Sequence, residues 1–302
     1  MSLPLGLISF TAKTSESGAT ETFSLFVDDS IEINGYWKKD NDGHWVNLAS
    51  KIEHVDDKIR IDFAIQDGGI FDNDGVANGT IVDPGGMGVL PRNSATLEEQ
   101  ITGLYVAFYD RAPDAEGLAY WKAQLQSGNT TLGDIAKGFA HHPRFVQEYG
   151  TLDHAGIAAK FYTNVLGQAG DAAGITYWTN QLDQGKTTAN VIADFIQTAL
   201  NVDLLAAKRA GSLTDAEYTV ALQRQTLLDN KVKAGLDFAS LFGTETVPQS
   251  SATALSGDPA YQAAIEVLEH VSADPASAWG LEAELIKLVG TEHAMQAILA
   301  IA

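Results

Sequence analysis

The chain has 302 residues, 45% hydrophobic and 19% charged, so it has enough apolar material to build cores and is not a disordered chain. Its formal net charge is −20, which disfavours binding to nucleic acid or to an anionic membrane surface. The absence of cysteine excludes disulfides, thiolate zinc sites and cysteine catalysis. No apolar run is long enough to span a membrane, so we expect no membrane insertion.

Residues 1–92 predict a small antiparallel β domain. Apolar and polar side chains alternate with a period of two at Phe23–Val27, at Ile31–Ile33 and at Ile59–Ile65. Sequences typical of turns separate these segments, namely Asn34–Gly35, residues 41–43 and Asp56–Asp57. Short alternating strands at this spacing predict a sandwich or a single sheet.

A glycine- and aspartate-rich segment follows, which we expect to be a loop from Asp67 to Gly88. Calcium prefers several hard oxygen ligands in a flexible geometry, and closely spaced carboxylates between glycines can supply them. The segment therefore predicts a structural calcium site, although its spacing is not that of an EF-hand. The candidate ligands are Asp67, Asp72, Asp74, Asn78 and Asp83. The other interpretation is a loop whose aspartates make Asx turns and stay solvated.

From Thr96 onward the apolar period becomes 3.6, which predicts that residues 93–302 form an all-α region. Leu97, Ile101, Leu104 and Phe108 lie on one face of the first helix. Capping boxes are predicted at Thr96 with Glu99 and at Thr214 with Glu217. We expect C-terminal helices within residues 212–302, interrupted by a linker at residues 244–257.

An internal repeat dominates the first half of this helical region. Shifting residues 105–136 by 57 positions onto residues 162–193 gives 14 identical pairs. A match of this quality indicates a duplicated helical unit, with copies at about residues 97–150 and 153–205. The pairs include Tyr105/Tyr162, Asp114/Asp171, Gly117/Gly174, Tyr120/Tyr177, Trp121/Trp178 and Gly128/Gly185.

The repeated residues have both structural and functional interpretations. Asp114 and Asp171 are suited to cap helices, and Gly128 and Gly185 to end them in a left-handed conformation. The repeated Tyr-Trp pairs favour a core position, and the alternative is an aromatic platform for sugar rings. Arg111 is spaced to pair with Asp114 across a surface turn, at a gain below about 1 kcal/mol.

Residues 105–121, together with Leu125, Gly128 and the segment Phe139–Tyr149, resemble the domain of unknown function numbered 4214. The second copy departs from the pattern at Gln168 and Gly170. The resemblance implies a helical repeat of S-layer proteins and of large secreted, calcium-dependent bacterial surface proteins. The β-rich segment resembles a small surface-protein domain found beside varied cell-anchoring signals. Neither resemblance implies an enzyme activity.

We therefore expect an α+β multidomain protein that acts as a non-enzymatic attachment or interaction module at the cell surface or outside the cell. The expected partner is cell-surface polysaccharide or a neighbouring copy of the protein. Trp37 and Trp45 flank a polar turn and are the candidate residues for stacking on a sugar. The chain has no Gly-x-Ser-x-Gly elbow and no phosphate-binding loop. The alternatives are a hydrolase of surface glycans and a spacer without a ligand.

Overall fold

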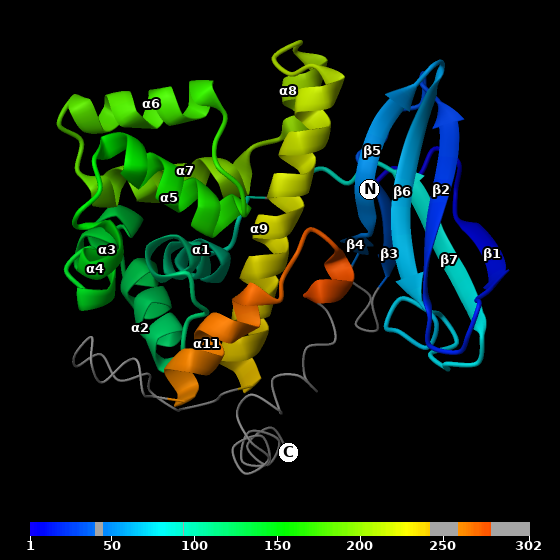
Figure 1. The fold of residues 1–302 in the computed structure, drawn as a ribbon, viewed down its shortest axis with the longest axis horizontal. Helices are drawn as coiled ribbons and strands as arrows, with labels where there is room; N and C mark the ends of the chain where they lie inside the picture. Colours follow the sequence, from blue (N-terminus) through cyan, green and yellow to red (C-terminus); the bar gives the residue numbers. More distant parts are fainter. Residues whose placement is uncertain (40–44, 93, 242–258, 279–302) are drawn as a thin grey trace. The chain divides into compact units, whose positions relative to one another are not determined.

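The computed structural model describes residues 1–39, 45–92, 94–241 and 259–278 (Figure 1). An antiparallel β region precedes a helical region, which confirms the α+β class. The chain divides into two compact units. One contains Met1–Asn93, Asp203–Thr226 and Ser272–Gly280, and the other contains Ser94–Val202 and Leu227–Val271.

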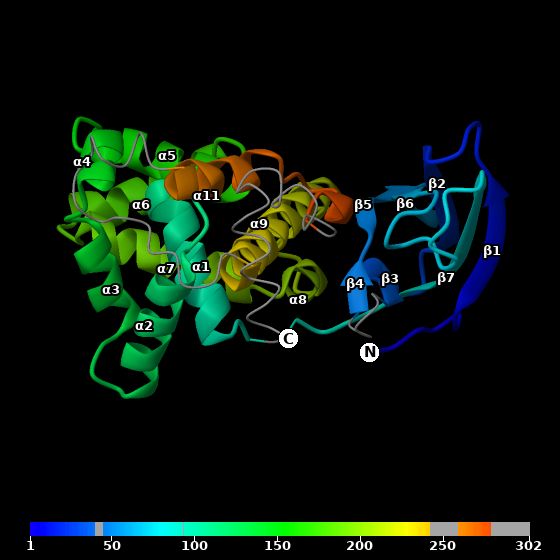
Figure 2. The ribbon, with the colours of Figure 1, turned by 90° about the horizontal axis from the view of Figure 1, so that it is seen from below.

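The first unit contains two antiparallel sheets, seen as two layers in Figure 2. One has the strand order β1-β7-β3-β4 and the other the order β2-β6-β5. The strands are β1 (Ile8–Lys13), β2 (Thr20–Asp28), β3 (Gly35–Lys39), β4 (Trp45–Asn47), β5 (Ala49–Val55), β6 (Lys58–Gln66) and β7 (Thr80–Gly88).

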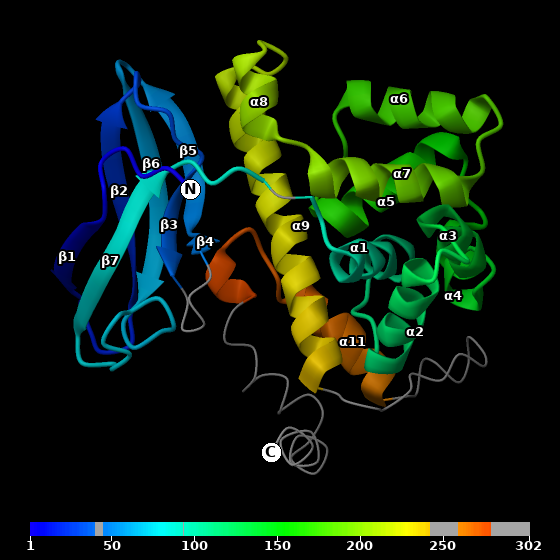
Figure 3. The same ribbon diagram turned by 180° about the vertical axis from the view of Figure 1, so that it is seen from behind.

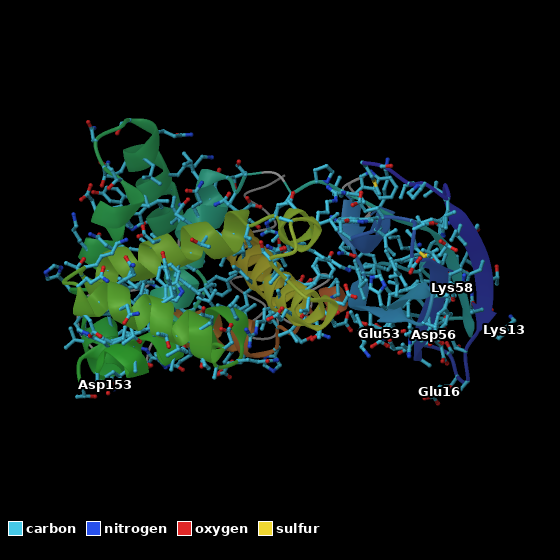
Figure 4. The ribbon with its side chains drawn as sticks, turned by 90° about the horizontal axis from the view of Figure 1, so that it is seen from above. Lys13, Glu16, Glu53, Asp56, Lys58 and Asp153 are labelled. Carbon is cyan, nitrogen blue, oxygen red and sulfur yellow. The ribbon has the colours of Figure 1, made fainter. Side chains whose placement is uncertain are left out.

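The predicted strands at residues 23–27 and 59–65 are confirmed as parts of β2 and β6, which pair along their whole length. The predicted turn at Asp56–Asp57 joins β5 to β6, and Asp56 takes the left-handed conformation, with a φ of 55°. Figure 4 labels Glu53, Asp56 and Lys58 near one another on the β unit.

Two sequence predictions in this unit are wrong. Residues 31–33 form no strand, because the amide of Ile31 bonds to the carbonyl of Asp28 and the chain bends there. The predicted loop ends at Gly79 rather than at Gly88, since the next nine residues form β7 between β1 and β3. Pro84 and the surrounding glycines concealed this strand, although Ile81 and Met87 on it are buried.

The core of the β unit lies between the two sheets. The ring of Tyr36 in β3 stacks on that of Phe63 in β6, with centroids 3.8 Å apart and planes at 12°. Phe23 in β2 extends this stack, with its centroid 5.5 Å from that of Phe63. The sheets are therefore joined by aromatic contacts from both inner faces, as in a sandwich.

Two helices belonging to the range predicted as all-α pack onto this β core. They are α8 (Leu204–Arg209) and the first part of α9 (Asp215–Leu241), which contribute Leu205, Tyr218 and Leu222. The side-chain amide of Gln223 donates to the backbone carbonyl of Ser50 at 3.2 Å, and the hydroxyl of Thr219 donates to the backbone carbonyl of Ile52. These contacts occupy backbone acceptors of β5, an edge strand that would otherwise be open to pairing.

The second unit is helical, and α1 is its centre, in contact with α2, α3, α4, α5 and α7 (Figure 3). Its helices in the repeat are α1 (Leu97–Tyr109), α2 (Ala115–Gln126), α3 (Leu132–Phe139), α4 (Pro143–Tyr149), α5 (His154–Leu166), α6 (Ala172–Asp183) and α7 (Thr188–Asn201). The identical pairs place α1, α2 and α3 in correspondence with α5, α6 and α7. We predicted one apolar face on α1, but every residue from Ile101 to Tyr109 is buried, because neighbours surround the helix.

The predicted helix ends are confirmed. Thr96 and Glu99 form a complete capping box, and Thr214 and Glu217 exchange the same bonds at the start of α9. Asp114 and Asp171 each accept the amide of the third residue that follows them. Gly128 and Gly185 follow α2 and α6 with φ values of 71° and 89°, in the left-handed region.

Beyond α9, the described residues include α11 (Pro259–Glu269) and a short 3₁₀ helix at Pro275–Ser277. The predicted linker at residues 244–257 and the predicted helices beyond residue 278 lie outside the described part of the chain. Among the helices that the structure does describe, none combines the length and the apolar character needed to cross a membrane.

Candidate functional site

The Asp/Gly loop between β6 and β7 is organised around the buried carboxylate of Asp67. Its two oxygens accept the backbone amides of Gly18 at 2.8 Å and Gly79 at 2.7 Å, and those of Asn78 and Thr80 at 3.3 and 3.2 Å. Desolvation raises the pKa of Asp67, but the four amides together outweigh it and lower that pKa. The carboxylate thus ties the connection between β1 and β2 to the start of β7.

The other predicted calcium ligands have similar partners. Asp72 is buried and accepts the amides of Gly68 and Val82, both at 2.8 Å. Asp74 is exposed and accepts the amide of Val76 at 3.0 Å and the side-chain amide of Asn78 at 3.1 Å. In each of these bonds a carboxylate oxygen accepts an N–H group of the protein, where a calcium site would place the cation.

The structure does not bring the five predicted ligands to one point. Asp67, Asp72, Asp74 and Asn78 belong to the same loop, whereas Asp83 lies on β7 and is fully buried. Among the described residues, no group of three or more His, Cys, Asp or Glu side chains is arranged to hold a metal ion. Only Asp74, which accepts the amide two residues further on, fits the Asx-turn interpretation, since Asp67 and Asp72 are buried and accept amides from more distant residues. Calcium binding stays a prediction.

Asp83 instead belongs to a buried polar cluster that the sequence did not reveal. Lys38 donates to one oxygen of Asp83 at 2.5 Å, and the hydroxyl of Tyr36 donates to the other. All three side chains are almost inaccessible to solvent. A lysine two residues from a buried tyrosine on a short strand was the available signal, because side chains two apart on a strand share a face.

Trp37 and Trp45 do not form an exposed stacking pair. Trp37 is buried, and its indole Nε1 donates to the carbonyl of Gly88 at 3.2 Å. Trp45 is half-buried, and the ammonium of Lys39 lies 5.4 Å from the centre of its ring. Trp37 therefore has little aromatic surface to offer a sugar, Trp45 is partly accessible, and stacking on a sugar stays a prediction for these residues.

The repeated Tyr-Trp pairs divide into one inner and one outer residue. Trp178 is 7% exposed, as a core position requires, whereas Trp121 is only half-buried. Tyr120 and Tyr177 are 55% and 56% exposed, although each is an aromatic residue in a packed repeat. In both copies the two rings meet edge to face with centroids 4.8 Å apart. The duplication therefore preserves an exposed tyrosine held against a tryptophan.

Arg111 pairs with Asp114 as predicted, but the pair is buried and not at the surface. Its side chain is 2% exposed, and its nearest contact to the carboxylate of Asp114 is 3.8 Å long. The guanidinium lies over the rings of Tyr105, Tyr109 and Tyr261, at 4.8, 5.6 and 5.3 Å from their centres. Cation–π contacts of this kind stabilise a charge that is removed from water.

The helix α11 contacts the turn that contains Arg111, because the backbone amide of Ala112 donates to the backbone carbonyl of Ala264 at 2.7 Å. Gln168 occupies the position of Arg111 in the second copy and is exposed. The two copies thus share the same helices but differ at this turn. In the first copy the turn contacts α11 and Arg111 is buried, whereas in the second copy Gln168 is exposed.

These features define an α+β protein whose helical unit contains a tandem duplication. Two segments of it, residues 93–143 and 136–205, match the model of the family described as Domain of unknown function (DUF4214). Together the two matches cover both copies of the repeat, and they confirm that domain within residues 93–205. Comparisons with curated proteins and with solved structures found no match.

Proposed function

We propose that this chain is a non-enzymatic attachment module of a bacterial cell-surface or secreted protein and that it binds surface polysaccharide. The observation that carries the proposal is the exposure of Tyr120 and Tyr177 at the same position of the two repeats. A folded chain has a hydrophobic reason to bury aromatic rings, so two equivalent exposed rings favour a contact outside the chain.

The surroundings of the two tyrosines suit them to a sugar. Each ring is fixed at its edge by Trp121 or Trp178, so little side-chain freedom is lost when a ligand binds. A tyrosine offers an apolar face to the C–H groups of a sugar ring and a hydroxyl to its polar groups. The two tyrosines thus offer two equivalent contact points, one on α2 and one on α6.

The charge of the chain and its family support the same class of partner. A net charge of −20 opposes contact with phosphate-rich polymers and favours neutral ones. The match of residues 93–205 to DUF4214, together with the resemblance of this region to S-layer and adhesin-associated repeats, supports a location outside the cell or on its surface.

The hydrolase alternative receives less support from the described carboxyl groups. A glycosidase needs one carboxylic acid with a raised pKa opposite an ionised partner. The described carboxyl groups whose pKa is shifted are all shifted downward, mostly by hydrogen bonds and lysine contacts. They are Asp28, Asp67, Glu98, Asp134 and Asp215.

The proposal is tested on a glycan array with the intact chain, the single variants Tyr120→Ala and Tyr177→Ala, and the double variant. We expect the single variants to bind more weakly and the double variant to lose binding, with an unchanged helical circular dichroism signal. Phe26→Ala is the matched control, because Phe26 is also 55% exposed but lies on β2.

Three results would contradict the proposal. Binding that survives in the double variant would separate the tyrosines from the ligand. An intact chain that binds no glycan would favour either a spacer without a ligand or a module that binds neighbouring copies of itself. Sedimentation at rising concentration distinguishes these two, because only the second would self-associate. Release of reducing ends from bacterial surface polysaccharide would favour the hydrolase.

A further inference from the structure

Lys38 and Asp83 meet inside the β unit, where water has little access. The ammonium nitrogen of Lys38 lies 2.5 Å from one carboxylate oxygen of Asp83, and their side chains are 4% and 0% exposed. Lys38 lies on β3 and Asp83 on the adjacent strand β7. The pair thus brings an amine and a carboxyl carbon into near-contact from two strands of one sheet.

The register of β3 and β7 holds the two groups in this position. Tyr36 pairs with Met87 and Trp37 with Gly86 in the antiparallel ladder, so Lys38 and Asp83 are near diagonal neighbours. The absence of a side chain at Gly85 is required, because a Cβ there would lie 2.6 Å from the ring carbon Cζ of Tyr36. Two packed strands therefore limit the separation of the amine and the carboxyl group.

Tyr36 supplies a fixed hydrogen-bond donor to the same carboxyl group. Its hydroxyl donates to the oxygen of Asp83 that Lys38 does not contact, and its ring is held by the stack on Phe63. Burial, and then the neighbouring carboxylate, raise the pKa of Tyr36, so its hydroxyl keeps its proton. A donor aimed at a carboxyl oxygen can stabilise negative charge that develops there during attack on the carbon.

The hydrogen bond between the two groups is a direct path for a proton. Its transfer from the ammonium nitrogen to the carboxylate oxygen converts two charged groups into two neutral ones. The product of that transfer is a neutral amine next to a carboxylic acid, which are the two partners of an amide condensation.

We propose that Lys38 and Asp83 condense to form an amide that cross-links β3 to β7. One proton moves from Nζ of Lys38 to the carboxylate, and the amine lone pair then attacks Cγ of Asp83 to form the C–N bond. Tyr36 stabilises the oxyanion through its hydrogen bond. The C–O bond to the protonated oxygen breaks, and this oxygen leaves as water with a second proton from the nitrogen. The reaction needs no oxidant, reductant or cofactor.

The cross-link has a mechanical consequence for the β unit. The strand β7 lies between β1 and β3 and is the last strand before α1 in the chain, so tension on the chain would act on it. An amide between β3 and β7 would prevent β7 from being pulled out of the sheet. It would also restrict the unfolded chain between residues 38 and 83, which stabilises the fold in the way that a disulfide does.

The test is the mass of the purified intact chain under denaturing conditions. We expect a mass lower than that of the sequence by one water molecule, and a branched peptide after digestion that joins the segments containing Lys38 and Asp83. The variant Lys38→Met should have its full sequence mass. The variant Lys39→Met is the matched control, since Lys39 is exposed on the same strand and should keep the water loss.

Tyr36→Phe retains the ring, removes only the hydroxyl and should slow the appearance of the lighter species after synthesis. An intact chain with the full sequence mass would overturn the proposal, whatever the variants do. A water loss that persists in Lys38→Met, or that mild alkali reverses, would assign the loss to an aspartyl succinimide and would also overturn it. The branched peptide of the intact chain decides the question even where a variant fails to fold.

Discussion

The hydroxyl of Tyr105 lies directly over Gly117, at 2.5 Å from the position that a Cβ of this glycine would occupy. The second copy has the same relationship between Tyr162 and Gly174, with an even closer approach. In each copy a tyrosine of the first helix therefore passes over the first turn of the second helix. This contact explains why both the tyrosine and the glycine are among the identical pairs of the repeat.

Replacing Gly117 with alanine should destabilise the helical unit, although alanine has the higher helix propensity. The propensity gain is about 1 kcal/mol, whereas displacement of the buried Tyr105 ring should cost roughly 1–3 kcal/mol. Urea unfolding followed by circular dichroism measures the difference. Gly138→Ala in α3 is the control, because a Cβ there meets nothing within 4 Å. Gly138→Ala should stabilise the helical unit. Equal effects of Gly117→Ala and Gly138→Ala would show that the contact of Tyr105 with Gly117 does not restrict this position.

The two repeated tryptophans should differ in their contribution to stability. Trp178→Ala should lower the free energy of unfolding by roughly 3–5 kcal/mol, because the ring is buried and leaves a cavity. Trp121→Ala should cost less, since Trp121 is only half-buried. The comparison uses denaturant unfolding of both variants. A fully stable Trp178→Ala variant would be incompatible with a core role.

The sequence predicted the helical repeat better than the β unit for a physical reason. Caps such as Thr96, Asp114 and Gly128 act within a few residues of their own position, so a local pattern is enough to identify them. The strand β7 depends on pairing with β1 and β3, which are distant in sequence. Its glycines and Pro84 have low strand propensity, and only the tertiary pairing overrides it.

The surroundings of the predicted site residues were hidden from the sequence for a related reason. The spacing of Asp67, Asp72 and Asp74 indicates carboxylates near one another, but it does not reveal which donors surround each of them. The same limit applies to Trp37, whose burial depends on the packing of its sheet rather than on its sequence neighbours. Tyr120 and Tyr177 were recognised as repeated residues, but their exposure could be learned only from the structure.

Arg111 should be essential for the stability of the helical unit. Arg111→Met removes the cation from the three tyrosine rings and leaves the buried Asp114 without its nearest positive charge. Breaking a buried pair of this kind costs roughly 3–5 kcal/mol. Gln168→Met changes the equivalent exposed position of the second copy and should stay within about 0.5 kcal/mol. Similar unfolding free energies for the two variants would show that burial of Arg111 contributes little.

Asp67 should stabilise the β unit without a metal ion. Asp67→Asn replaces one acceptor oxygen with an amide group that faces the backbone donors of the loop. We expect this variant to melt at a lower temperature than the intact chain in the presence of a chelator. An unchanged melting temperature would contradict the role of Asp67 as an amide acceptor.

The same melting experiment tests the calcium prediction separately. If the loop binds calcium, millimolar calcium should raise the melting temperature of the intact chain by several degrees, since a ligand that binds only the native state stabilises it. Identical curves with calcium and with chelator, and no metal retained on the purified chain, would remove the calcium prediction.

His142 should make the stability of the helical unit depend on pH in the mildly acidic range. Its Nδ1 accepts the amide of Arg144 at 3.1 Å and caps the start of α4, which requires a neutral nitrogen at that position. Desolvation, followed by the charges of Arg111 and Arg144, lowers the pKa of His142 from its ordinary value of 6.5. The unfolded chain therefore binds a proton at a higher pH than the folded chain does.

The free energy of unfolding should accordingly be highest above pH 6.5 and should fall as the pH decreases from 6.5 towards the lowered pKa of the folded chain. His142→Asn keeps a capping side chain but removes the titrating group, so its stability should change less over the same interval. Urea unfolding of both chains at a series of pH values between neutral and mildly acidic measures the two slopes. The other histidines are common to both chains, so the difference between the slopes reports on His142. Parallel curves for the two chains would show that the imidazole does not titrate against folding, and a steeper curve for His142→Asn would reverse the assigned sign.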